Sequence, residues 1–389
     1  MLKGKVLVLA ALSFLVMLLP ASTVRAAVFL DGFTESLVVD GLGRPTAMAL
    51  APDGRIFITD QDGAVLVVRD GALLAEPFIT LETDSRNERG VVGIAVDPNY
   101  LENQWVYIYY TVPATATDPA HNRIVRYTHA DDLAVPGSEQ VILNLDPLGN
   151  DTNHNGGGMH FGPHDGMLYL GTGENAVTPN AQSLESRLGK ILRFRPDGTI
   201  PTDNPFYAEA EGDNRMIWAM GLRNPYTFAF NAAGRMLIND VGSHFDVPPG
   251  WIPYEEVNEG IAGANYGWPV VEGAFDPAAH PAFTNPLFTY EHTGAEPDDH
   301  GCAPTGGVFY EPENLTFPPE YHGAYLFADH CSGWIRRLDP ATGDVYRFIY
   351  QAPYGLLDLD VSAAGDLYYL ARAGTYPTGT LFRVHYGSP

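Results

Sequence analysis

The chain has 389 residues, of which 45% are hydrophobic, and its 47 acidic and 22 basic side chains give a formal charge of −25. A chain of this length and apolar content can bury a large core, which excludes a disordered protein. The negative charge repels nucleic acid and anionic membranes, so we expect neither as a partner.

The first 26 residues are typical of a secretory signal peptide. Lys3 and Lys5 precede an apolar run at residues 6–19, and small residues lead to Ala26. This order predicts export, with cleavage after Ala26. The alternative is an uncleaved membrane anchor, but the apolar run is short for a span. We expect a mature protein that is secreted or periplasmic and has no membrane span after cleavage.

The chain from residue 27 onward is rich in short apolar runs separated by turns. Its 41 glycines and 31 prolines are spread along the whole length and interrupt long helices. Runs rich in Val, Ile, Tyr and Phe end in Asp-Gly, Ala-Gly or Pro-Asn turns, which is typical of antiparallel strands. The pattern predicts an all-β protein.

A unit of two strands, the second rich in aromatic residues, recurs along the chain. The copies begin at Thr46, Gly93, Met159, Phe228, Gly306 and Leu357. Candidate third strands follow five of them, at residues 64–71, 122–130, 189–198, 333–343 and 379–386. Six copies predict a six-bladed β-propeller around a central channel, and their uneven spacing predicts long inserted loops. A β-sandwich and a parallel β-helix are the competing folds.

The sequence offers no internal domain boundary. No stretch after residue 26 is rich enough in Pro, Ser or charge to act as a linker. A closed ring also cannot be divided without exposing sheet edges. We therefore predict a single propeller domain over residues 27–389.

His154 is the first candidate functional residue. It lies in the run Asn-His-Asn-Gly-Gly-Gly, directly before a predicted strand. Glycines allow positive φ angles and close ligand approach, so this loop can present an imidazole to a binding site. Such a histidine can accept a proton near neutral pH. The alternative is an ordinary surface-loop histidine.

The longest inserted loop, residues 251–276, combines Glu255 and Glu256 with a glycine-bounded turn at Tyr266. Adjacent carboxylates beside turn carbonyls predict an oxygen cage for Ca²⁺, and a solvated acidic loop is the alternative. Just upstream, Arg223 and Asn224 precede a predicted strand. An arginine there can hold a planar anion by a two-point contact or form a salt bridge between blades.

The two cysteines, Cys302 and Cys331, lie in the predicted mature chain. In an exported protein they are expected to form one disulfide, which stabilises by about 3 kcal/mol in the chain-entropy model. Redox catalysis by the pair is not expected, because the Cys-x-x-Cys spacing is absent.

Six stretches, in order, resemble the glucose/sorbosone dehydrogenase family. They are ERGVVGIAVDPNY from Glu88, HNGGG from His154, GTGE ending at Glu174, RLGKILRFRPDGTIPTDNPF from Arg187, IWAMGLRNP from Ile217 and EEVNEGIAGANYGWPVVEG from Glu255. The likeness extends from about Gly43 to Tyr386. Members of this family are soluble sugar dehydrogenases that use pyrroloquinoline quinone (PQQ) and calcium on a six-bladed propeller.

The resemblance implies a role for each matching residue. His154 would act as general base, taking the proton of a sugar hydroxyl while a hydride passes to the quinone. The resemblance also places Glu88 and Glu174 near the substrate and Arg223 and Asn224 at the cofactor. The backbone carbonyls of Gly242 and Ser243 would bind the cofactor's Ca²⁺. A second, structural Ca²⁺ site would contain Glu255, Glu256 and Tyr266.

The chain also departs from the family pattern. Cys331, Gly355 and Leu357 stand where a lysine and two arginines clamp the cofactor's carboxylates. Charge-assisted contacts of this kind are worth about 1.5–3 kcal/mol each, so their loss weakens cofactor binding. Gly158 stands where many members have arginine, and Asn153 replaces an acidic residue. Replacement charge could come from Arg372, His330, His300 or Arg336.

The sequence leaves two main function classes open. The first is an exported PQQ-dependent dehydrogenase that oxidises a sugar or related polyol and passes the electrons to an unidentified acceptor. The second is a non-catalytic propeller that binds a protein or glycan and has lost the cofactor, as in hedgehog-interacting-type proteins, which the chain also resembles. Retention of His154, Arg223 and Asn224 favours the enzyme, whereas loss of the clamp favours the binding module. A calcium-dependent hydrolase is a third alternative.

Overall fold

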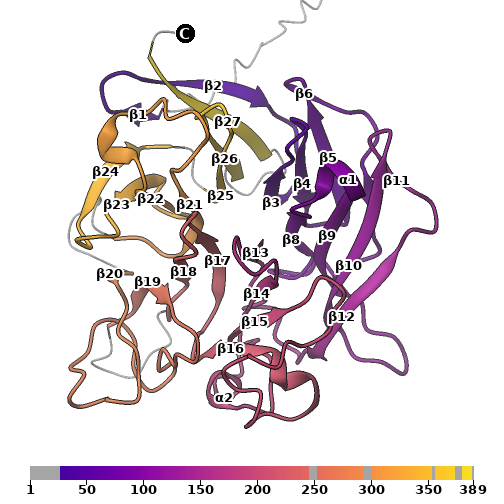
Figure 1. The fold of residues 1–389 in the computed structure, drawn as a ribbon, viewed down its shortest axis with the longest axis vertical. Helices are drawn as coiled ribbons and strands as arrows, with labels where there is room; N and C mark the ends of the chain where they lie inside the picture. Colours follow the sequence, from indigo (N-terminus) through magenta and orange to yellow (C-terminus); the bar gives the residue numbers. More distant parts are fainter. Residues whose placement is uncertain (1–26, 245–251, 293–299, 353–354, 373–378, 388–389) are drawn as a thin grey trace, which may run out of the picture.

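The structure is a computed structural model that describes residues 27–244, 252–292, 300–352, 355–372 and 379–387. The predicted signal peptide lies outside this part. Six antiparallel sheets stand around a central axis (Figure 1). The predicted all-β, six-bladed propeller with long inserted loops is therefore confirmed. The described helices are α1 (Tyr100–Asn103), α2 (Pro179–Gln182) and two 3₁₀ turns (Gly212–Met216 and Pro319–Tyr321). None of the described helices is long and apolar enough to cross a membrane.

The first three blades follow one another along the chain. Blade 1 contains β3 (Pro45–Leu50), β4 (Ile56–Asp60), β5 (Ala64–Arg69), β6 (Ala72–Leu73) and β7 (Ile79–Thr80). Blade 2 contains β8 (Val91–Val96), β9 (Trp105–Val112), β10 (His121–Ala130), β11 (Leu133–Ala134) and β12 (Gln140–Pro147). Blade 3 contains β13 (Met159–Phe161), β14 (Leu168–Thr172), β15 (Lys190–Phe194) and β16 (Ile217–Met220).

The second half of the chain forms the other three blades. Blade 4 contains β17 (Pro225–Phe230), β18 (Met236–Asp240), β19 (Tyr254–Gly260) and β20 (Phe288–Glu291). Blade 5 contains β21 (Pro304–Phe309), β22 (Tyr325–Asp329), β23 (Trp334–Leu338) and β24 (Val345–Tyr350). Blade 6 contains β25 (Leu356–Val361), β26 (Leu367–Arg372) and β27 (Gly379–Tyr386).

The two N-terminal strands close the ring. β2 (Phe33–Val39) pairs antiparallel with β27, with Phe33 opposite Tyr386, and becomes the outer strand of blade 6. β1 (Val28–Phe29) pairs with β24 and adds an outer strand to blade 5. Both of these blades thus combine strands from the two ends of the chain, so hydrogen bonds between strands close the circle.

The first strand of each blade lines the centre of the ring. β3, β8, β13, β17, β21 and β25 contact one another in this order, and β25 contacts β3 to complete the circle (Figure 1). The second strands lie deeper in the wall, where each sheet packs between two others. Residues 106–111 of β9 are all buried, for example. Burial on both faces explains why these strands appear as continuous apolar runs rather than as an alternation of apolar and polar residues.

The six predicted two-strand units are all confirmed as the first two strands of successive blades. The five predicted third strands coincide with β5, β10, β15, β23 and β27. The third strand of blade 4, β19, was expected to be part of a long loop. Its acidic residues hide the usual apolar signal of a strand, because Glu255 and Glu256 are themselves buried in it.

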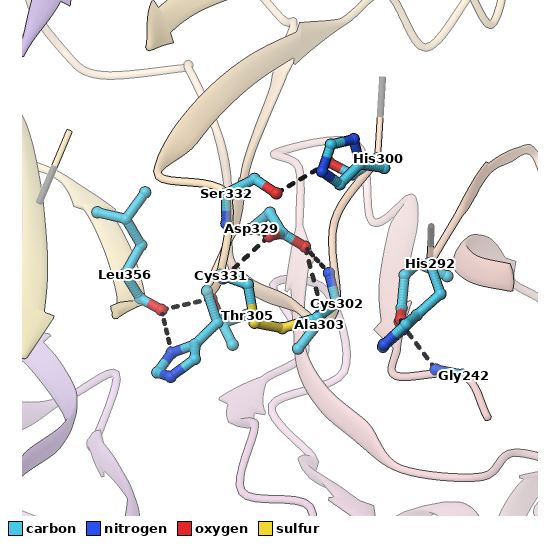
Figure 2. Close-up of a disulfide and its surroundings, with 12 residues drawn as sticks. Gly242, His292, His300, Cys302, Ala303, Thr305, Asp329, Cys331, Ser332 and Leu356 are labelled. Atoms are coloured by element: carbon cyan, nitrogen blue, oxygen red, sulfur yellow. Dashed lines mark hydrogen bonds and ion pairs between the residues drawn. A yellow bond between two sulfur atoms is a disulfide. The ribbon is translucent and has the colours of Figure 1, made fainter. Parts of the chain in front are cut away.

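The predicted disulfide joins Cys302 and Cys331, whose Cα atoms are 5.6 Å apart. The buried carboxylate of Asp329, at the end of β22, lies between the two chain segments that the disulfide joins (Figure 2). One oxygen accepts the N–H groups of Cys302 and Ala303 at 2.9 and 3.0 Å, and the other accepts those of Cys331 and Ser332 at 3.0 and 2.8 Å. A single carboxylate therefore fixes both segments that the disulfide joins.

Ring closure depends on the packing of β2, so we expect Phe33→Ala to destabilise the fold. The Phe33 ring packs edge-on against Phe317 and Phe348, with centroids 4.8 Å apart in both pairs. Truncating a buried phenylalanine costs about 3–5 kcal/mol. The free energy of unfolding in denaturant measures this loss. The matched control is Leu37→Ala on the same strand, where the side chain is 57% exposed and the expected change is within about 0.5 kcal/mol. Equal small losses for both variants would contradict the role of β2.

Candidate active site

One end of the channel collects polar side chains from several blades. The segment before the first strand and the segment after the second strand of a blade emerge together, because these strands are antiparallel neighbours. Such segments surround a cavity of about 780 Å³. It is lined by Glu88, Asn153, His154, Glu174, Ala176, Thr178, Arg223, Asn224, Val241, Gly242, Ser243, His244, Trp268, Pro269, Cys302 and Ala303. The structure thus brings together seven predicted residues: Glu88, His154, Glu174, Arg223, Asn224, Gly242 and Ser243.

His154 and Glu174 form a hydrogen-bonded pair in the cavity wall. The Nδ1 atom of His154 lies 2.6 Å from Oε1 of Glu174. The glutamate is buried, and the histidine side chain is 12% exposed. An ionised carboxylate only accepts hydrogen bonds, so Nδ1 carries the hydrogen and Nε2 of the neutral ring is left as a proton acceptor. This is the arrangement of a general base with an orienting carboxylate.

The backbone around His154 is equally constrained. His154 has a positive φ of 57°, and its N–H donates to Oε2 of Glu88 at 2.7 Å. Gly173 passes so close that any side chain there would collide with the carbonyl oxygen of His154. Glu88 is exposed at the cavity, where its carboxylate can also meet a ligand.

Asp240, at the end of β18, positions Arg223 and Asn224. Its carboxylate accepts the N–H groups of Arg223 and Asn224 at 3.0 and 2.7 Å. Burial raises the pKa of Asp240 to about 7. Asn224 in turn accepts the N–H of Gly156 at 3.0 Å, which links blade 4 to the loop of His154. The Arg223 guanidinium lies over the Trp268 ring, 5.6 Å from its centroid.

Two glutamates, the buried Glu255 and the half-buried Glu272, orient the backbone at Gly242 and Ser243. The N–H of Gly242 donates to Glu255 at 2.9 Å, and the Ser243 hydroxyl donates to Glu272 at 2.6 Å. The Ser243 N–H also donates to Glu272. Within the described part of the chain, no donor reaches the carbonyl oxygen of Gly242 or Ser243. Oriented carbonyls of this kind are suitable ligands for a hard cation such as Ca²⁺.

Glu255 and Glu256 are adjacent on β19 but contact different neighbours. Glu255 accepts a hydrogen bond from His292 Nδ1 at 2.8 Å, in addition to that from Gly242. Glu256 accepts from Asn258 at 2.9 Å and from the Gly273 N–H at 2.7 Å. Neighbouring side chains of a strand face opposite sides, which explains the separation. Burial raises the pKa of both carboxyl groups, to about 8 for Glu256.

Tyr266 is buried in the turn after β19. Its hydroxyl donates to the carbonyl oxygen of Glu259 and accepts the N–H of Ile261 at 3.1 Å. Among the residues that the structure describes, no group of three or more His, Cys, Asp or Glu side chains is arranged to hold a metal. A calcium site at Glu255, Glu256 and Tyr266 stays a prediction.

The three positions where the family has its cationic clamp lie on blades 5 and 6. Cys331 is held in the disulfide, and Leu357 is a buried residue of β25. Gly355 has a φ of 83° and donates its N–H to the carbonyl of His330 at 2.7 Å. Arg372 donates to Gln61 at 2.9 Å. Gly355 and Leu357 are buried in the wall of the propeller, His330 and Arg372 are half-buried, and Cys331 is exposed.

The other two suggested sources of charge, His300 and Arg336, lie on blade 5. The His300 carbonyl accepts the Ser332 hydroxyl at 3.0 Å (Figure 2), and the Arg336 guanidinium lies 4.1 Å from the Trp334 ring centroid. Of the described residues that line the cavity, Arg223 is the one arginine or lysine.

Several residues of the site were not predicted. Asp240, Glu272, His244 and Trp268 position the cavity wall or line it. One signal could have found Asp240: second strands of three blades end in Ile-Thr-Asp, Ile-Asn-Asp and Phe-Ala-Asp, at Asp60, Asp240 and Asp329. The other residues become neighbours of the site only through the ring.

Comparisons with known proteins identify the family of the chain. A family model described as Glucose / Sorbosone dehydrogenase matches residues 42–369. Quinoprotein glucose dehydrogenase B of Acinetobacter calcoaceticus is 28% identical over 283 residues, which cover 66% of this chain and 56% of that protein. A proposed oxidoreductase (glucose dehydrogenase) of Thermus thermophilus superimposes with a TM-score of 0.74 at 29% identity, covering 91% of this chain and 100% of that one.

A relative with a different name also matches. Human Hedgehog-interacting protein is 29% identical over 218 residues, which cover 48% of this chain and 30% of that protein. The chain thus spans only part of the curated relatives' length. The family model, by contrast, extends over most of the chain and includes the cavity residues. The chain belongs to the glucose/sorbosone dehydrogenase family.

Proposed function

We propose that the protein is an exported dehydrogenase that oxidises a hydroxyl group of a sugar or related polyol, using PQQ with Ca²⁺. The observation that carries the proposal is the His154–Glu174 pair in the wall of a cavity that also contains Arg223. Family membership and the quinoprotein among its relatives support the choice of cofactor. The electron acceptor is open. Export follows from the predicted signal peptide, and residues 27–389 would form the mature propeller, in the periplasm or outside the cell.

Two features of the cavity support binding of a planar, anionic cofactor. Its volume of about 780 Å³ lies within the range of small-molecule sites. Arg223 and Asn224 would hold the cofactor. The carbonyl oxygens of Gly242 and Ser243, which accept no hydrogen bond from the described residues, would hold its Ca²⁺. The cation would also offset the shortage of basic side chains. When bound, the quinone would accept a hydride, which carries the two electrons of the oxidation.

The residues of the chain provide the proton chemistry. Nε2 of His154 takes the proton of the substrate hydroxyl, and Glu174 stabilises the imidazolium that results. Glu88 fixes the backbone of His154 and offers its carboxylate to a sugar hydroxyl. The cavity opens toward solvent, to which the proton is then released.

A second function is favoured by one observation. Cys331 is held in a disulfide and Leu357 is buried, so neither position can contribute a cationic contact to an anionic cofactor. A propeller of this kind could bind a protein or glycan without catalysis, and the similarity to Hedgehog-interacting protein is consistent with such a role.

Cofactor binding separates the two functions. We expect the mature protein, stripped of metal, to bind PQQ in isothermal titration with micromolar or tighter affinity when millimolar Ca²⁺ is present, and more weakly without it. The reason is that Ca²⁺ supplies charge that the clamp positions lack. Arg223→Gln should weaken binding further, since it removes a charge-assisted contact. An absence of binding in both conditions would contradict the dehydrogenase and favour the binding propeller.

Removal of the base should abolish sugar oxidation without unfolding the protein. We expect His154→Gln to lower kcat by about 100- to 10,000-fold, the usual contribution of a general base. The thermal midpoint should change little, because the glutamine amide can still donate to Glu174. His164→Gln is the control, since His164 is exposed and outside the cavity. A large loss of thermal stability in His154→Gln would instead identify His154 as a packing residue.

Calcium should stabilise the fold if Glu256 is part of a structural site. At a hundredfold excess over its dissociation constant, a bound ion adds about 2.7 kcal/mol to the free energy of unfolding. We therefore expect Ca²⁺ to raise the thermal midpoint of the chelator-treated protein, and Glu256→Gln to reduce this increase. Glu259→Gln, whose side chain pairs with Arg235, is the matched control on the same strand. A melting curve that does not respond to Ca²⁺ would contradict the site.

A further inference from the structure

The segment that carries His154 has no helix or strand of its own. Residues 149–155, called the His154 loop below, run between β12 and β13 without regular structure. We propose that Arg89 and Asn175, two buried side chains from neighbouring blades, are positioning residues for His154. The kinetic part of this inference rests on the proposed dehydrogenase function, whereas its geometric part does not.

Arg89 holds the loop from blade 2. The side chain is 1% exposed, and its guanidinium donates to the carbonyl oxygens of Gly149 at 2.7 Å and Asp151 at 2.9 Å. Its other terminal nitrogen donates to Asp84 at 2.9 Å. The Asp84 carboxylate also pairs with Arg86, and these arginines hold its pKa well below the usual range. The direct hydrogen bond to Asp84 orients the Arg89 guanidinium so that its other terminal nitrogen faces the loop.

Asn175 holds the same loop from blade 3. The residue is 1% exposed and has a φ of 56°, a conformation that asparagine tolerates better than most residues. Its side chain accepts the N–H of Gly149 at 2.7 Å and donates to the carbonyls of Asp151 and Asn153 at 3.1 and 3.2 Å. Its own N–H donates to the carbonyl of His154 at 3.2 Å. Arg89 and Asn175 therefore meet on Gly149 and Asp151.

The two positioning residues stand next to the two carboxylates that touch His154. Glu88 accepts the backbone N–H of His154, and Arg89 follows it in sequence. Glu174 accepts from the imidazole, and Asn175 follows it. Each dipeptide thus holds the histidine with its first residue and the loop backbone with its second. This double attachment fixes an irregular loop in which His154 itself has a positive φ.

Loss of either positioning residue should loosen His154 without removing a group that touches the substrate. A displacement of about 1 Å in a catalytic group can cost about 100-fold in rate. We therefore expect Arg89→Met and Asn175→Gly to lower kcat by about this factor, with a smaller change in KM. Glycine is chosen at position 175 because it keeps the positive φ while removing the side chain.

A chemical readout tests the geometry directly. Diethyl pyrocarbonate acylates accessible neutral imidazoles, and peptide mass spectrometry gives the rate at each histidine of the full mature chain. We expect the rate at His154 to rise several-fold in Arg89→Met and Asn175→Gly. The rate at the exposed His164 should stay the same and serves as internal reference.

The matched control is Arg86→Met. Arg86 pairs with the same carboxylate of Asp84 at 2.7 Å, but its side chain is 69% exposed and has no hydrogen bond to the His154 loop in the described structure. We expect this variant to acylate and turn over as the wild type does. An unchanged rate at His154 in the folded Arg89 and Asn175 variants would overturn the inference. If no form of the protein oxidises a sugar, the proposed function fails, and the acylation rates still decide the role of the two residues.

Discussion

The site depends on one repeated interaction: a carboxylate at the end of a blade's second strand accepts backbone N–H groups from the segment that enters the first strand. In blade 1, Asp60 accepts the backbone N–H of Arg44 at 3.1 Å. In blades 4 and 5, Asp240 and Asp329 each accept the backbone N–H groups of the two residues that precede the first strand. Each of these aspartates lies opposite a proline that begins the first strand: Pro45, Pro225 and Pro304. Proline has no N–H, so the preceding residues provide the donors. The interaction gives the loops around the channel a fixed conformation.

Blade 3 lacks this aspartate and fixes its entering segment differently. Its second strand ends at Thr172, and the residues that follow, Glu174 and Asn175, extend over the neighbouring loop. This arrangement has a functional consequence, because the carboxylate of Glu174 contacts the imidazole of His154 rather than backbone N–H groups. Three blades therefore use the aspartate that ends the second strand to stabilise a loop, whereas blade 3 uses Glu174, two residues beyond the end of its second strand, to orient a titratable group.

The sequence was sufficient to predict the fold but only part of the site. Strand and turn signals are local, so six repeats could be counted along the chain, and β19 was missed because buried glutamates mimic a polar loop. His154 was identified from its glycine-rich loop. Its hydrogen bond to Glu174, however, forms because the segment before β13 lies beside the segment after β14 in blade 3. The hydrogen bond from Arg89 to the His154 loop comes from blade 2. Long-range neighbours of this kind leave no spacing pattern in a single sequence.

The two sides of the cavity carry different chemistry, and this asymmetry constrains any ligand. On the side of blade 4, Arg223 provides a positive charge and Gly242 and Ser243 provide carbonyl oxygens. On the side of blade 5, the wall contains Cys302 and Ala303, held by the disulfide and by Asp329, and it offers no positive side chain in the described structure. An anionic group is therefore stabilised only toward blade 4, and a covalent bond keeps the opposite wall from adjusting. We therefore expect a ligand with several negative charges to bind more tightly when a cation accompanies it, and the Ca²⁺ dependence of binding is the property that would distinguish an active family member from a binding propeller.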